Sequence, residues 1–131
     1  VHNTFTEAKD IVWAQNYSDN IFWCFCPNAN EYIEGRQPNY SIFKNEKCTI
    51  GTDSLASNWS LSILDELKTI SIKDPTISLT TLIKWASYNG AQFLGFNQLG
   101  SIEIGKTPGL NLITKLKDVN LTPNSSIQKI I

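Results

Sequence analysis

The sequence predicts an α/β fold built on parallel strands. Two short apolar runs, residues 20–26 and 48–50, have the aromatic and β-branched composition of buried strands. Segments with a helical spacing of apolar residues separate and follow these runs. Because alternating strands and helices pair in parallel through right-handed crossovers, we expect an arc of sheet with helices on one side and with exposed edges.

The first part of the chain predicts two strands around one helix. Residues 1–6 have the pattern of the end of a strand, with His2 near its carboxyl end, and a helix is expected over 7–17. Residues 20–26 form a continuous apolar run, which is typical of a strand buried on both faces, and Pro27 ends it.

The middle of the chain predicts a loop that leads to a third strand. Gly35 and Pro38 indicate a long loop over 28–38, followed by a short helix over 41–44. The third strand is expected at 48–50.

Two helices are predicted beyond the third strand. Residues 59–70 have a broad apolar face, and the helix is expected to end before Pro75. A second helix is expected over 79–89 with Gly90 ending it, and residues 91–95 are predicted to add a helical turn. Three segments then alternate like exposed strands: 101–105, 110–114 and 127–131.

Composition argues against several classes of partner. Eleven Lys and Arg face twelve Asp and Glu, so the formal net charge of -1 gives no reason to expect nucleic acid or an acidic membrane as partner. No apolar run approaches the roughly 18 residues of a membrane-spanning helix. The chain lacks methionine and begins at Val1, so we expect a fragment or a processed chain.

The three cysteines predict reduced thiols rather than a disulfide framework. Cys24 and Cys26 lie on the same side of an expected strand, and Cys48 lies in another. An odd number of buried cysteines favours a cytoplasmic protein. The spacing does not match known structural zinc sites.

Asp53 is the most informative polar residue, and its position allows two interpretations. It follows an expected strand after Gly51, and the carboxyl ends of strands in α/β folds carry catalytic groups. Aspartate is also a common helix cap, and the next predicted helix follows a few residues later. Periodicity alone favours the cap.

Four segments in order resemble the amidohydrolase superfamily, in its deaminase and chlorohydrolase branch. The most specific is Gly51-Thr-Asp-Ser-Leu-Ala-Ser-Asn58, which resembles that branch's eighth-strand motif. The others are Val1-His-Asn, Cys26-Pro-Asn-Ala-Asn30, and the stretch from Ala86 to Lys106, which resembles the helix and strands that leave the barrel.

The resemblance implies the C-terminal part of a TIM-like (β/α)8 barrel, about strands 6 to 8 with their helices, plus return strands of a small β domain. Residues 1–98 would form the barrel part and 99–131 the return strands. The family's paired first-strand histidines and its fifth-strand histidine are absent from this chain.

The resemblance also implies roles for individual residues. Asp53 would ligate one divalent metal, zinc or alternatively iron, and exchange a proton with the attacking water. His2 would orient that water or polarise the substrate, although a surface histidine is the simpler alternative. Four further residues are candidates for the substrate loops, and their asparagines are first interpreted as residues that brace turns: Asn28, Asn30, Ser57 and Asn58.

The function implied for the intact protein is hydrolysis of a non-peptide C–N or C–Cl bond, centred on deamination of a nucleoside-like heterocycle. We expect the fragment alone to be inactive and to lack the metal. The alternative is a non-catalytic binding or assembly module, which would form a homo-oligomer through its exposed sheet edges.

Overall fold

The computed structural model describes residues 1–131 as two small sheets and five α-helices. In chain order the elements are α1 (Ala8–Gln15), β1 (Phe22–Phe25), α2 (Pro27–Glu34), the 3-10 helix η1 (Tyr40–Phe43), β2 (Lys47–Ile50), α3 (Ile63–Lys73), α4 (Leu79–Ala86), α5 (Tyr88–Leu94), β3 (Asn111–Thr114) and β4 (Ser126–Lys129). The predicted α/β class is confirmed.

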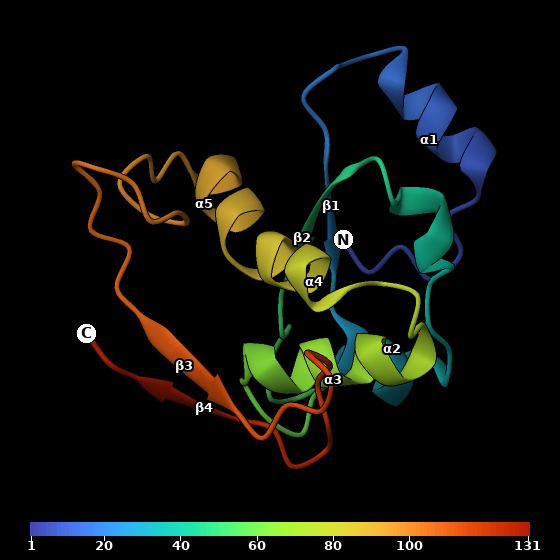
Figure 1. Ribbon diagram of the computed structural model, residues 1–131. Helices are drawn as coiled ribbons and strands as arrows, with labels where there is room; N and C mark the ends of the chain where they lie inside the picture. The colour runs from blue at the N-terminus through green and yellow to red at the C-terminus, as the bar shows by residue number, and fades with distance from the viewer.

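The parallel pair β1–β2 lies at the centre of the molecule (Figure 1). Its register pairs Phe22 with Lys47 and Phe25 with Ile50, so both strands end at the same edge. Just past the strands, the Gly51 N–H donates to the Phe25 carbonyl at 2.8 Å. The loops after both strands therefore begin side by side.

Aromatic packing around Phe25 fills the core beneath this pair. The Phe25 ring meets those of Tyr40 and Phe43 edge-on at 5.1 and 5.0 Å, and Trp85 lies at 5.6 Å. Burying each such side chain contributes about 1.5–3 kcal/mol. The other core members are Ile11, Cys48, Leu67, Ile70, Ile77 and Leu82.

The predicted strand at residues 1–6 is wrong. His2 and Asn3 have φ angles of 68° and 60°, and the segment forms turn hydrogen bonds, such as Thr6 N to Asn3 O, in place of a ladder. A strand needs a backbone hydrogen-bond ladder with a neighbour, and residues 1–6 contact β1 through the Asn3 side chain instead. The parallel sheet therefore has two strands, where an arc of three was expected. Within β1, only Phe25 is fully buried.

The predicted loop over 28–38 is also wrong, because its first part is helix α2. Pro27 occupies the first helical position, where its fixed φ favours a helix and its missing N–H costs nothing. Gly35, with φ 59°, ends the helix in a left-handed conformation that a residue without Cβ adopts easily. The short helix predicted at 41–44 is confirmed as η1, one residue earlier.

The predicted helix over 59–70 begins later and runs further, as α3. The side-chain oxygen of Ser62 accepts the Asp65 N–H at 3.3 Å and so sets the start of the helix. The helix stops before Pro75, as predicted.

The helix predicted over 79–89 is two helices. α4 ends at Ala86, Ser87 leaves helical geometry with φ -130° and ψ -74°, and α5 begins at Tyr88. Gly90 lies inside α5 and does not end a helix, whereas Gly95, at φ 71°, does. The helical turn expected over 91–95 is part of α5.

The C-terminal segment forms an antiparallel ribbon, β3–β4, on the opposite side of the molecule from α1 (Figure 1). The strands predicted at 110–114 and 127–131 are confirmed with shifts of one or two residues. The strand predicted at 101–105 is wrong: this stretch forms turns, and Ile104 is fully exposed with no neighbouring strand. No helix is long and apolar enough to cross a bilayer.

Candidate active site

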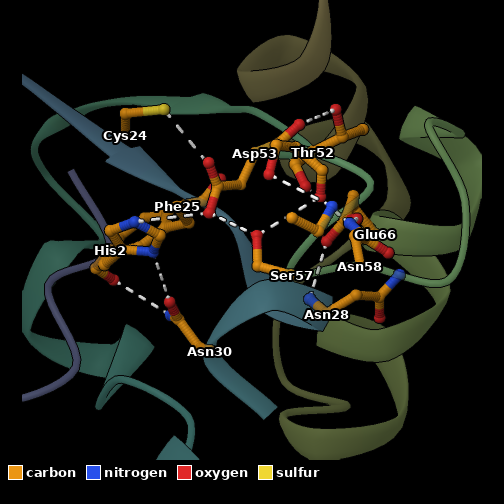
Figure 2. A network of polar contacts seen from close by, with 12 residues as sticks. His2, Cys24, Phe25, Asn28, Asn30, Thr52, Asp53, Ser57, Asn58 and Glu66 are labelled. Carbon is orange, nitrogen blue, oxygen red and sulfur yellow. Dashed lines mark hydrogen bonds and ion pairs between the residues drawn. The ribbon is translucent and has the colours of Figure 1, made fainter. Parts of the chain in front are cut away.

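Polar side chains gather where β1 and β2 end, in the loop after β2 and on the helices after both strands (Figure 2). The parallel register places Cys26, which directly precedes α2, beside Gly51, which opens the loop to Asp53. The N-terminal segment passes the same edge, where the Asn3 side chain donates to the Cys24 carbonyl at 2.8 Å. Three separate segments thus converge on one site.

Asp53 holds an unusual backbone conformation at this edge. Its φ of 57° is in the left-handed region, which costs energy for most residues but is tolerated by aspartate. The Ser57 hydroxyl donates to Asp53 Oδ2 at 2.7 Å. This hydrogen bond is the main cause that lowers the pKa of Asp53 below its ordinary value, so the carboxylate is ionised at neutral pH.

His2 faces Asp53 across a short gap. His2 Nε2 lies 3.9 Å from Asp53 Oδ2, too far for a hydrogen bond and close enough for one small group to contact both. The side chains are 36% and 35% exposed, so ligands can reach them from solvent. The two residues for which the resemblance implies catalytic roles therefore lie side by side.

The Asn30 side chain holds His2 in place. Its side chain forms two contacts with this one residue: Asn30 Oδ1 lies 2.8 Å from His2 Nδ1, and Asn30 Nδ2 donates to the His2 carbonyl at 3.1 Å. Asn30 is only 1% exposed on α2, so its amide is held by the surrounding protein.

Glu66 lies beneath the loop as the centre of a second, fully buried group. The Asn28 backbone N–H donates to Glu66 Oε2 at 2.8 Å, and Asn58 Nδ2 donates to Oε1 at 2.7 Å and to the Thr52 carbonyl at 2.6 Å. Burial is the main cause that raises the pKa of Glu66, and these hydrogen bonds oppose it. Glu66 thereby ties α3 to α2 and to the Asp53 loop.

Sequence reasoning missed Glu66, although a signal was present. In α3 the residues Ile63, Glu66 and Ile70 follow one another at helical spacing, so the glutamate lies on the apolar face of its own helix. A charged residue on such a face requires a polar partner in the core.

Each predicted site residue now has a place. Asp53 and His2 come together, whereas the polar atoms of the four substrate-loop candidates bond mainly to protein groups. Asn28 Oδ1 accepts from Thr69 Oγ1 at 2.6 Å, so its amide links two helices. The interpretation of the asparagines as bracing residues agrees with these contacts. The helix-cap interpretation of Asp53 is wrong, because Ser62 caps α3.

The cysteines are free thiols, as predicted. Cys24 and Cys26 point to the same side of β1, since a Cβ built on Gly51 would lie 3.4 Å from each sulfur. Cys26 and Cys48 are buried and Cys24 is half-buried.

A divalent cation would find two suitable donors here. Asp53 and His2 supply a carboxylate and an imidazole, both of which zinc accepts. No group of three or more His, Cys, Asp and Glu side chains in the chain is placed to hold a metal ion. Catalytic zinc typically takes three protein ligands, so this chain by itself offers part of such a site.

Comparison with known proteins identifies the class. The Amidohydrolase family matches residues 1–131. A 5-methylthioadenosine/S-adenosylhomocysteine deaminase from Teredinibacter turnerae is 32% identical over 133 residues, covering 94% of this chain and 29% of the relative.

Solved structures agree with this match. An adenosine deaminase from Xanthomonas campestris with bound zinc has a TM-score of 0.73 and 27% identity, covering 86% of this chain and 27% of that one. The aminofutalosine deaminase of Helicobacter pylori in complex with methylthio-coformycin has a TM-score of 0.68 and 28% identity, covering 82% and 28%.

The fold is similar to that of these solved deaminases, and the chain belongs to the amidohydrolase family. It resembles members named as deaminases of nucleosides. The chain spans less than a third of the length of these relatives.

Proposed function

We propose that this chain supplies part of the active site of a metal-dependent deaminase that acts on an adenosine-type nucleoside. The observation that carries the proposal is the approach of His2 Nε2 to Asp53 Oδ2 at the carboxyl ends of parallel strands. Its support from outside the chain is that the relatives and solved structures described above are named as deaminases. The same names favour deamination over removal of a halide.

In this proposal β1 and β2 are the seventh and eighth strands of a (β/α)8 barrel, and the segment holding His2 stands at the end of the sixth. Residues 1–98 form the barrel part. Residues 99–131, with the β3–β4 ribbon, belong to a small β domain. The parallel register of β1 and β2 supports the assignment, since barrel strands are parallel throughout.

The chain's own residues divide the chemistry between them. Asp53, ionised through the hydrogen bond from Ser57, takes a proton from the attacking water and passes it to the amino group that leaves as ammonia. His2 orients the reacting groups from the opposite side of the gap. A bound divalent cation, zinc or iron, would supply the acidity that makes the water a nucleophile near neutral pH, with Asp53 as one ligand.

The remaining candidates act through these two residues. Asn30 holds His2, and Ser57 holds the Asp53 carboxylate. Asn28 and Asn58 secure the loop through Glu66. We propose that these four position the catalytic pair, with the substrate gripped mainly by parts of the protein outside this chain.

The proposal is tested with a longer protein that contains this chain. The purified protein, loaded with zinc or iron, is incubated with adenosine, 5′-deoxyadenosine, 5-methylthioadenosine and S-adenosylhomocysteine, and ammonia release is measured. We expect release from at least one nucleoside and its loss after chelation. Absence of release from all four, by folded and metal-loaded protein, would contradict the proposal.

The 131-residue chain by itself is tested separately from the longer protein. With two donors at the site, we expect it to be inactive and to lose zinc on dialysis against a mild chelator. Zinc retained at one equivalent would contradict that expectation.

A non-catalytic assembly module stays as a second candidate because the sheet edges outside the β1–β2 pair are unpaired in this chain. Light scattering of the 131-residue chain tests it. Stable dimers held by these edges would favour it, and a monomer would count against it.

A further inference from the structure

The two contacts between Asn30 and His2 fix which way the asparagine amide faces. The His2 carbonyl can only accept, so the group that meets it at 3.1 Å must be the NH2 end of the amide. The oxygen end therefore faces His2 Nδ1, at 2.8 Å. Reversing the amide would set two acceptors against each other at the carbonyl.

This orientation determines the proton on the imidazole. An amide oxygen only accepts, so the ring nitrogen facing it must carry a hydrogen. In a neutral imidazole the other nitrogen then has a free lone pair. We infer that Asn30 is a positioning residue that holds neutral His2 as the Nδ1–H tautomer, with the Nε2 lone pair turned toward Asp53.

The surroundings of Asn30 fix the orientation of its side-chain amide, and so the tautomer of His2. Asn30 is buried, and its own backbone N–H donates to the Cys26 carbonyl at 2.9 Å in the first turn of α2. Pro27 and Gly35 fix the two ends of that helix. The amide is therefore already oriented before a ligand binds, so binding does not have to order this side chain.

The tautomer decides what can occupy the gap. Neutral His2 presents an acceptor at Nε2, and Asp53 Oδ2, 3.9 Å away, is also an acceptor. Only a hydrogen-bond donor or a cation satisfies both at once. Neutral His2 thus receives a proton or hydrogen bond from a water molecule, and it cannot polarise a substrate by donating from Nε2. This last step rests on the proposed function.

Nuclear magnetic resonance tests the inference directly, because His2 is the only histidine in the chain. The 131-residue chain is labelled with 15N, and the two ring nitrogens are observed at a pH where the ring is neutral. We expect the shift of a protonated Nδ1 and of a bare Nε2. The opposite pattern, with protonated Nε2, overturns the inference.

Variants of Asn30 show whether this residue makes the selection. Asn30→Ala removes the acceptor, and we expect the Nε2–H form, which free histidine prefers in water, to become the major one. Asn30→Asp retains an acceptor and should preserve the Nδ1–H form, although it cannot donate to the His2 carbonyl. Retention of the wild-type pattern in Asn30→Ala overturns the inference.

Asn89→Ala is the matched control, since Asn89 is also buried and also donates to a backbone carbonyl, that of Cys48, at 2.7 Å. Its ring-nitrogen shifts should match those of the wild type. Because these measurements need neither metal nor substrate, their failure is distinct from failure of the deaminase proposal, which only the ammonia assay decides.

Discussion

The site has two layers that differ in exposure and in how many polar atoms remain free. In the outer layer, His2 and Asp53 are about a third exposed and stand 3.9 Å apart without a direct hydrogen bond. In the inner layer, Glu66 is fully buried and both of its oxygens accept hydrogen bonds from Asn28 and Asn58. In the outer layer, polar atoms remain free to contact a ligand. In the inner layer, the polar atoms form the hydrogen bonds that hold the loop in place.

Because of this difference, we expect substitutions in the two layers to have different effects on activity and stability. Loss of an outer side chain removes chemistry and leaves the buried hydrogen bonds intact. Loss of an inner side chain leaves buried donors without partners, which costs stability. Substitutions in each layer separate the two effects.

The largest effect is expected from Asp53→Asn in a longer protein that contains this chain. The amide has the shape of the carboxylate but cannot take a proton from water, so turnover should fall by about 10²–10⁴-fold. Ammonia release measures the loss, and circular dichroism with thermal unfolding checks that the fold survives. Activity within a few fold of wild type would contradict the assignment of Asp53.

The next effect concerns the inner layer and is measured on the 131-residue chain. Glu66→Ala removes the acceptor of two buried donors and leaves a cavity, so the free energy of unfolding should drop by about 2–5 kcal/mol. Urea unfolding measures it. The matched control is Glu103→Ala, which removes an exposed glutamate and should leave the urea midpoint nearly unchanged. Equal losses in both variants would show that Glu66 is not a buried brace.

A smaller effect is expected in the pH dependence of stability. Burial raises the pKa of Glu66 above its ordinary value of 4.5, so the folded chain binds this proton more tightly than the unfolded chain. The stabilising contribution is complete below pH 4.5 and is lost as the pH rises through the folded pKa.

Glu66→Gln should remove this component, as measured by urea midpoints across the pH range. Glu103 provides a control of opposite sign, since a hydrogen bond with Ser101 is the main cause that lowers its pKa. Stability that rises with pH in the wild type relative to Glu66→Gln would contradict the prediction.

Much of the fold and of the outer layer could be predicted from sequence. Apolar runs that stop at Pro27 and Gly51 locate β1 and β2 within a residue or two, and the motif around Asp53 indicates the site. His2 was placed at the site by the order of motifs alone, because one histidine has no periodicity to reveal its neighbours.

The inner layer could not be predicted, for physical reasons. Glu66 gains its role from donors 38 and 8 residues away in the sequence, and such pairings depend on how α2 and α3 pack. Helix α2 was predicted as a loop because its short polar sequence is followed by Gly35 and Pro38, which indicate a loop when read locally. Residues 1–6 do not form a strand because a strand needs a hydrogen-bonded partner, and the local sequence does not show whether one is present.

The smallest expected effect extends the comparison to the thiols beside the site. Cys24 is half-buried, and a hydrogen bond from Cys26 is the main cause that lowers its pKa below the ordinary value, whereas burial raises the pKa of Cys48. Because the thiolate is the reactive form, iodoacetamide at neutral pH should label Cys24 first in the native chain, as read by peptide mass spectrometry. In Cys24→Ser the other two thiols should stay slow until the chain is unfolded. Labelling of Cys48 as fast as that of Cys24 would contradict this prediction, because it would show that the core around β2 opens as readily as the half-buried edge of β1.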